Sequence, residues 1–98
     1  MVRGRRAGTP RIVVHVTDTV GPARFGLAVN KAVGGSVQRH RVARRLRHRL
    51  ADQITAWDEL GCDVVVRALP PAATASSEQL AADLESCRRR LSQKGSRT

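Results

Sequence analysis

The chain has 98 residues, which is enough for one compact domain. It carries 18 Lys and Arg against 8 Asp and Glu, a formal net charge of +10, and among the basic residues only Lys31 and Lys94 are Lys. Arg binds phosphate in two-point geometry and stacks on bases, so this excess predicts a nucleic-acid partner. No apolar run approaches transmembrane length, and no membrane partner is expected.

Composition also suggests how the chain is divided. Residues 1–10 are basic and glycine-rich without periodicity, and they are interpreted as a flexible arm or the remnant of an N-terminal helix. Residues 11–92 are predicted to form a single RNA-binding α+β domain. Residues 93–98 are polar and are predicted to be a disordered tail.

Two strands are predicted at the start of this domain, over residues 11–17 and 24–30, because both segments alternate in side-chain type. The side chains expected on one face are Ile12, Val14 and Val16 in the first strand and Phe25, Leu27 and Val29 in the second. Gly21-Pro22 marks the turn between them. The short polar connection indicates an antiparallel hairpin.

A long helix follows. Gly34 and Gly35 end the second strand, and Ser36 is the predicted N-cap of a helix over residues 37–57. Its apolar stripe repeats at spacings of four and three residues and consists of Val42, Leu46, Leu50, Ile54 and Trp57.

The rest of the domain is predicted to be a strand and a helix. The β-branched run 63–68 suits a strand near the centre of a sheet. Ser76 and Gln79 form an S-x-x-Q capping box at the start of the last helix. That helix is expected to bury Leu80, Leu84, Cys87 and Leu91. The order strand, strand, helix, strand, helix predicts an α+β fold with helices packed on a small sheet.

The two cysteines are predicted to be structural. Cys62 and Cys87 have no His or Cys at the spacing of metal ligands, and neither is expected to bind a metal. A free Cys within secondary structure behaves as a small apolar residue. Reduced cysteines suit the cytoplasm, which is the expected location.

The most informative segment is 31–49, KAVGGSVQRHRVARRLRHR. On a helix its cationic face lies opposite the Leu46 stripe and consists of Arg41, Arg44, Arg45 and His48. Like charges three and four residues apart repel by about 0.2–0.5 kcal/mol per pair, and the segment offers no acidic partner before Asp52. Arg39 in the first turn opposes the helix dipole, although the free N–H groups there suit phosphate. The face is therefore predicted to bind RNA or DNA.

This segment resembles the bacterial ribonuclease P proteins, whose motif K-x-x-G-x-A-V-x-R-N-R-x-K-R-x-x-R enters a helix after a strand. The matching residues are Lys31, Gly34, Val37, Arg39, Arg41, Arg44 and Arg47. Ser36, His40 and Ala43 depart from the motif, which has Ala, Asn and Lys there. The flanking strands also resemble the family, so the likeness extends over residues 4–91.

The resemblance implies a ribonuclease P protein-like fold with a left-handed βαβ crossover, shared with a domain of a small-subunit ribosomal protein. It implies an accessory subunit of the endoribonuclease that removes the 5′ leader of precursor tRNA, with the chemistry and the Mg²⁺ carried by the RNA subunit. The partners would be ribonuclease P RNA and precursor tRNA, with no DNA. The residues implied to bind RNA are Lys31, Arg39, His40, Arg41, Arg44, Arg45, Arg47 and His48.

A leader-binding cleft across the sheet is also implied, with His15, Phe25 and Arg67 as candidates. His15 lies on the strand face opposite Ile12, so not all candidates share one face. Family members begin with another helix that forms one wall of the cleft, and residues 1–6 resemble only its end. Weakened discrimination of the leader is therefore expected.

Two other functions compete. A structural RNA-binding protein of ribosomal or RNA-chaperone type explains the charge but not the motif. A DNA regulator would need a second helix just before the basic helix, where a strand is predicted instead. A catalytic role for His40 or His48 is not expected, because neither has a nucleophile or carboxylate partner nearby in the sequence.

Overall fold

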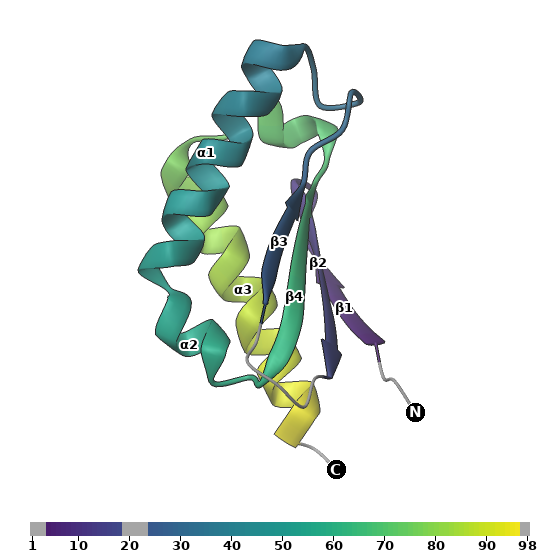
Figure 1. Cartoon of the computed structure of the whole chain (residues 1–98), viewed down its shortest axis with the longest axis vertical. Coiled ribbons are helices and arrows are strands. Elements are labelled where there is room, and N and C mark those ends of the chain that lie inside the picture. Colours follow the sequence, from purple (N-terminus) through teal and green to yellow (C-terminus); the bar gives the residue numbers. More distant parts are fainter. Residues whose placement is uncertain (1–3, 19–23, 97–98) are drawn as a thin grey trace.

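The computed structural model describes residues 4–18 and 24–96. Four strands form one mixed sheet in the order β1-β2-β4-β3, and the helices lie on one face of it (Figure 1). The strands are β1 (Gly4–Gly8), β2 (Ile12–Asp18), β3 (Phe25–Ala28) and β4 (Cys62–Ala68). The helices are α1 (Ser36–Asp52), α2 (Ile54–Asp58), the 3-10 turn η1 (Pro70–Thr74) and α3 (Ser77–Ser96). The predicted α+β class is confirmed.

The core lies between the sheet and the helices, as the alternation predicts. The buried strand residues are Ile12, Val14 and Val16 of β2 and Val64, Val66 and Ala68 of β4. The two strands present one face because Val14 pairs with Val66 in the antiparallel register. The helices cover it with Val42, Leu46 and Leu50 of α1 and with Leu80, Leu84, Cys87 and Leu91 of α3. An ion pair between Arg11 and Asp83 at 3.2 Å joins the start of β2 to α3.

The predicted hairpin between the first two strands is wrong. β4 lies between β2 and β3, antiparallel to β2 and parallel to β3, and it is central as predicted. All seven residues of β4 pair with β2, and the β-branched Val64, Val65 and Val66 lie at the centre of this ladder, where their side chains suit a pleated sheet. The chain crosses from β3 to its parallel neighbour β4 through α1 and α2 (Figure 1). The predicted turn at Gly21-Pro22 lies outside the described residues.

Both predicted ends of the domain need correction. Residues 4–8 are not a flexible arm or a helical remnant but an edge strand, paired from Gly4 with Thr17 to Gly8 with Val13. The hydroxyl of Thr9 accepts hydrogen bonds at 3.2 Å from the N–H groups of Arg11 and Ile12, which builds the tight turn into β2. At the other end α3 continues to Ser96, so most of the predicted tail is helical.

The predicted single helix over residues 37–57 is divided. It begins after Gly35, which takes the N-cap position expected for Ser36, and it is interrupted at Gln53, whose φ of −106° is not helical. The Gln53 side chain donates to the Ala81 carbonyl at 3.1 Å and accepts from Trp57 Nε1 at 3.2 Å. The break buries Trp57, whereas Ile54 is 40% exposed and does not continue the apolar stripe.

Candidate nucleic-acid interface

The outer face of α1 is cationic with an apolar centre. Its core side is formed by Leu46 and its neighbours one turn away, so the side chains opposite them point away from the sheet. A hollow of about 490 Å³ opens there and is lined by Ser36, Val37, His40, Arg41 and Arg44. Val37 is 70% exposed. Within the described part of the chain no carboxylate forms an ion pair with Arg41 or Arg44, so both guanidinium groups are available to an anion.

Two other arginines of α1 face the neighbouring helix layer instead. Nη1 of Arg45 donates to the carbonyl of Ala75 at 2.7 Å, and Nε of Arg49 donates to the hydroxyl of Ser77 at 2.8 Å. Arg49 also forms ion pairs with Asp52 at 3.3 Å and with Glu78 at 3.7 Å. The sequence predicts Arg45 to be one of the RNA-binding residues. In the structure its guanidinium instead binds the Ala75 carbonyl just before α3, so Arg45 does not share the outer surface of Arg41 and Arg44.

The loop before α1 fixes how the helix N-terminus is presented. Val33 is buried and anchors the loop, and Gly34 adopts a φ of +152° that side-chain-bearing residues rarely take. A Cβ at Gly34 would collide with the side chain of Gln38. The Gln38 side-chain oxygen accepts from the Gly35 N–H at 3.1 Å and closes the first turn. Lys31 is exposed in this loop, next to a helix end that suits phosphate.

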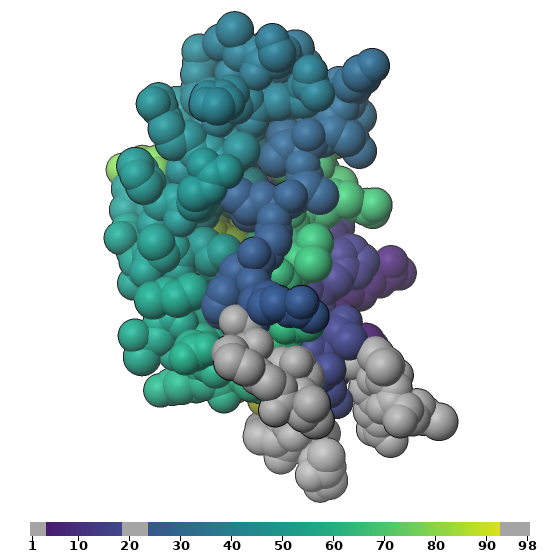
Figure 2. Space-filling model, in the orientation of Figure 1, coloured from purple at the N-terminus to yellow at the C-terminus, as the bar shows by residue number. Residues whose placement is uncertain are grey.

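The third side of α1 faces the edge strand β3. Arg39, Ala43 and Arg47 recur every four residues and line a groove against Leu27 and Val29, with a volume of about 390 Å³. Figure 2 shows this face of the molecule, on which α1 and β3 lie side by side. His40 lines both this groove and the outer hollow. His48, the remaining predicted residue of α1, is exposed.

The open face of the sheet gathers a second set of side chains. Across β1, β2 and β4 the register aligns Arg6 with His15 and His15 with Val65, and Arg67 lies two residues further along β4 on the same face. Val65 is 44% exposed because no described helix covers this side (Figure 1). His15 and Arg67 therefore share one surface.

Phe25 does not belong to that surface. It pairs with the buried Val64 and packs against the core from the helix side of the sheet. As expected, the three leader candidates do not share one face: strand alternation turns Phe25 to the face opposite His15 and Arg67, so Phe25 is removed from the candidates for the open surface. The sequence missed Arg6, which became recognisable only once residues 4–8 were seen to form a strand opposite His15.

Comparisons with known proteins agree with this arrangement. A family model described as ribonuclease P matches residues 1–92. The ribonuclease P protein component of Corynebacterium diphtheriae is 48% identical over 103 residues, covering 94% of this chain and 83% of that protein. The component from Rhodococcus opacus is 54% identical over 86 residues, covering 80% of this chain and 68% of that protein.

The chain belongs to the ribonuclease P protein family. It is the protein subunit of ribonuclease P, the endoribonuclease that matures the 5′ end of tRNA, and its family membership implies ribonuclease P RNA as its partner. The ribonuclease P protein of Staphylococcus aureus superposes with a TM-score of 0.78 at 22% identity, covering 90% of this chain and 81% of that one. The protein from Thermotoga maritima gives a TM-score of 0.74 at 17% identity, covering 86% and 80%. These two likenesses show a shared fold.

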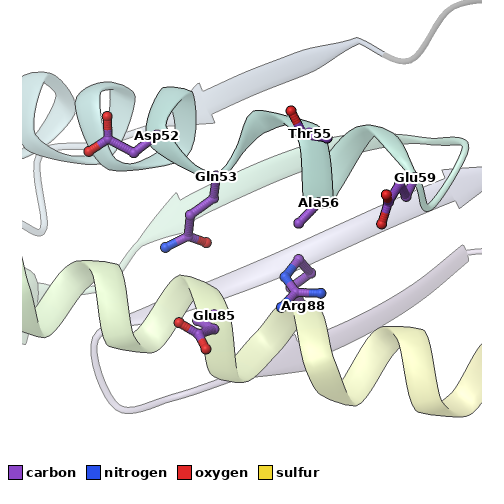
Figure 3. A pocket seen from close by; sticks show the side chains of 7 residues that line it. All are labelled: Asp52, Gln53, Thr55, Ala56, Glu59, Glu85 and Arg88. Atoms are coloured by element: carbon purple, nitrogen blue, oxygen red, sulfur yellow. The ribbon is translucent and has the colours of Figure 1, made fainter.

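Acidic residues of this ribonuclease P protein gather away from the cationic face. A groove of about 400 Å³ between α2 and α3 is lined by Asp52, Gln53, Thr55, Ala56, Glu59, Glu85 and Arg88 (Figure 3). The carboxylates of this groove, Asp52, Glu59 and Glu85, lie beside Arg88 and do not border the hollow of Arg41 and Arg44. In the described ranges no three His, Cys, Asp or Glu side chains come together as a set of metal ligands.

Both cysteines are buried and free. Burial raises the pKa of the Cys87 thiol, and burial together with the nearby Asp18 raises the pKa of Cys62. Neither thiol is therefore activated as a nucleophile. Of the helices that the structure describes, none is long and apolar enough to cross a bilayer.

Proposed function

We propose that this subunit contacts RNA through two surfaces. The cationic face of α1, together with Lys31 and the helix N-terminus, docks on the phosphates of ribonuclease P RNA. The open face of the sheet, with Arg6, His15, Val65 and Arg67, holds the 5′ leader of precursor tRNA. The Mg²⁺ ions that promote hydrolysis are held by the RNA subunit in this proposal, and the protein assists without binding a metal ion alone.

One observation carries the docking half of the proposal. Arg41 and Arg44 are exposed, face the same direction and have no carboxylate partner among the described residues, while nearby Arg49 is paired with Asp52 and Glu78. Unpaired like charges on one helix face are unfavourable in the free protein. A polyanion relieves that repulsion and releases its own counterions on binding.

The elements that precede α1 favour RNA over DNA. A reader of the DNA major groove presents its recognition helix after a second helix and a short turn. Here the edge strand β3 and a seven-residue loop precede α1. Docking on folded RNA through phosphate contacts suits this geometry. A cytoplasmic location, where RNA is matured and where free cysteines persist, is part of the same proposal.

The test is cleavage of precursor tRNA by ribonuclease P RNA at low Mg²⁺, with and without this protein. Stimulation is expected, and it should be lost in the double variant Arg41→Ala/Arg44→Ala. The matched control is Arg88→Ala/Arg89→Ala, which removes the same charge from α3. Equal losses in both double variants would show that only net charge matters and would contradict docking through α1.

A further inference from the structure

The groove between α1 and β3 lies beside the outer cationic hollow and shares Ser36 and His40 with it. Leu27 and Val29 form one wall, and Arg39, Ala43 and Arg47 of α1 form the other. A second hollow of about 380 Å³ continues it past Leu27 and Arg47 toward the core. The two volumes lie within the range of roughly 300–1,000 Å³ typical of sites that hold small organic groups.

The cations of this groove flank an apolar floor. Arg39 and Arg47 lie eight residues apart on one helical face, and Ala43 lies midway between them. Leu27 and Val29 are half-buried opposite this gap. Ala43 stands where the ribonuclease P motif has Lys. A long cationic side chain there would lie over the floor, whereas the methyl group of Ala43 leaves it open.

One polar atom of Arg39, which lines the groove, lacks a partner. Among the described residues the Nε of Arg39 is buried and has no hydrogen-bond acceptor. A buried donor without an acceptor costs about 1–3 kcal/mol, so such an atom calls for an acceptor supplied from outside. Because Nε itself is buried, an anionic oxygen in the groove satisfies it only when the Arg39 side chain turns toward the groove on binding.

We propose that this groove seats one unpaired nucleotide of the docked RNA. The base lies on the apolar floor of Leu27, Val29 and Ala43, and the phosphates on its two sides are held by Arg39 and by Arg47, which lie about 12 Å apart along the helix. Bases in a duplex are stacked and cannot reach such a floor, whereas an unpaired base in a loop or bulge can be splayed out. The inference rests on the proposed function, because it assigns the groove to the RNA that binds α1, and it adds a base contact to phosphate docking.

The first experiment uses mononucleotides and no ribonuclease P RNA. Methyl NMR spectra of the full chain are titrated with adenosine 5′-monophosphate and, separately, with ribose 5-phosphate. Saturable shifts at Leu27, Val29 and Ala43 are expected with the nucleotide, at an affinity about tenfold higher than for the base-free sugar, as one covered face of a base would give. Equal affinities would reduce the groove to a phosphate site and overturn the proposal. Binding of a hexaglutamate peptide at least as tight as the nucleotide would overturn it in favour of an acidic protein segment.

The second experiment restores the Lys of the motif. Ala43→Lys adds a cation inside the groove, and Ala51→Lys adds the same cation at an exposed position of the same helix. If the groove held only phosphate, Ala43→Lys would tighten binding of ribonuclease P RNA. If the groove seats a base, the Lys side chain blocks it and the effect on affinity is reversed. The Ala43→Lys variant should then bind ribonuclease P RNA about tenfold more weakly than Ala51→Lys at equal salt. Binding by Ala43→Lys that equals or exceeds that of Ala51→Lys would overturn the base seat.

These results separate the two proposals. If the wild-type chain prefers the mononucleotide but does not bind ribonuclease P RNA, the base seat stands as a local site and the docking proposal fails. If the wild-type chain binds ribonuclease P RNA without preferring the nucleotide over the sugar phosphate, docking stands and the base seat fails. Thermal unfolding of both lysine variants checks that they are folded, and ribose 5-phosphate titrations of Ala43→Lys distinguish a blocked floor from a lost phosphate site.

Discussion

Nη1 of Arg45 donates a 2.7 Å hydrogen bond to the backbone carbonyl of Ala75, one residue before the capping box of α3. The bond joins the middle of α1 to the start of α3 across 30 residues of sequence. Arg44, the preceding residue, is exposed on the outer face of the same helix. Two neighbouring arginines therefore have different tasks, one in holding helices together and one in presenting charge.

We expect these two residues to differ when each is changed to Ala. Arg45→Ala leaves the Ala75 carbonyl without its charged donor and should lower the free energy of unfolding by about 1–3 kcal/mol. Arg44→Ala should change that free energy by less than about 0.5 kcal/mol and reduce the salt dependence of RNA binding by about 0.7 in slope. Urea unfolding and RNA binding at several salt concentrations measure both quantities. Equal stability losses would contradict the separation.

The whole docking surface predicts a definite salt dependence. Five cations border it once Arg45 is set aside, namely Lys31, Arg39, Arg41, Arg44 and Arg47. If each meets one phosphate, log K should fall with log salt at a slope of about −3.5, using roughly 0.7 per contact. Fluorescence anisotropy with ribonuclease P RNA between low and physiological salt measures this slope. A flat response would contradict docking through phosphates.

The open sheet face should discriminate precursor from mature tRNA. Val65→Glu places an anion in the row of Arg6 and His15, where a leader phosphate would otherwise lie. Stability should be nearly unchanged because Val65 is 44% exposed, whereas affinity of the holoenzyme for precursor tRNA should fall relative to mature tRNA. Ala82→Glu, an exposed position of α3, is the control for added charge. An equal loss of affinity for precursor and mature tRNA would show that the leader does not bind this face.

Local sequence patterns were sufficient to predict most of the residues that form the core. Alternation in β2 and four-residue spacing in α1 report directly which side chains are buried, so Val14, Val16, Leu46 and Leu50 were assigned correctly. The capping box was also predictable, because the Ser76 and Gln79 side chains each accept a hydrogen bond from the other residue's backbone N–H. Such features depend on residues a few positions apart and need no knowledge of the fold.

The features that the sequence did not reveal depend on distant partners. β1 is glycine-rich and has no strand pattern of its own, and it is held by β2 and by the Arg5 side chain, which donates to the Leu91 carbonyl at 2.8 Å. The insertion of β4 between β2 and β3 and the contact of Arg45 with Ala75 are also non-local. A motif identified the cationic face, but only the tertiary contact with Ala75 separates Arg45 from the residues of that face. Strand alternation indicated that the leader candidates cannot all share one face, and the sheet register places Phe25 on the helix side.

The capping box of α3 should contribute measurably to stability. The Ser76 hydroxyl accepts from the Gln79 N–H at 3.1 Å, and the Gln79 side chain accepts from the Ser76 N–H at 2.9 Å. Ser76→Ala should lower the free energy of unfolding by about 1 kcal/mol, because one N–H of the first turn loses its acceptor. Ser92→Ala, on the exposed side of the same helix, should have little effect. Chemical denaturation of the two variants measures the difference, and equal midpoints would show that the box is replaced by water.

The buried thiol of Cys87 should make the protein less stable in alkali. Burial raises its pKa in the folded state, so the thiol stays neutral there at a pH at which the unfolded chain has begun to ionise. The stability that the neutral thiol contributes to the folded state is therefore fully present below the ordinary thiol pKa and is lost as pH rises through and above that value. For one group the free energy of unfolding falls by no more than about 1.4 kcal/mol per pH unit. The chain has no Tyr, so few other groups titrate in this range. Unfolding free energies measured from neutral to alkaline pH should fall more steeply for the wild type than for Cys87→Ala, whose smaller side chain lowers stability equally at every pH. Parallel curves for the two proteins would show that the thiol ionises as readily in the folded chain as in the unfolded one.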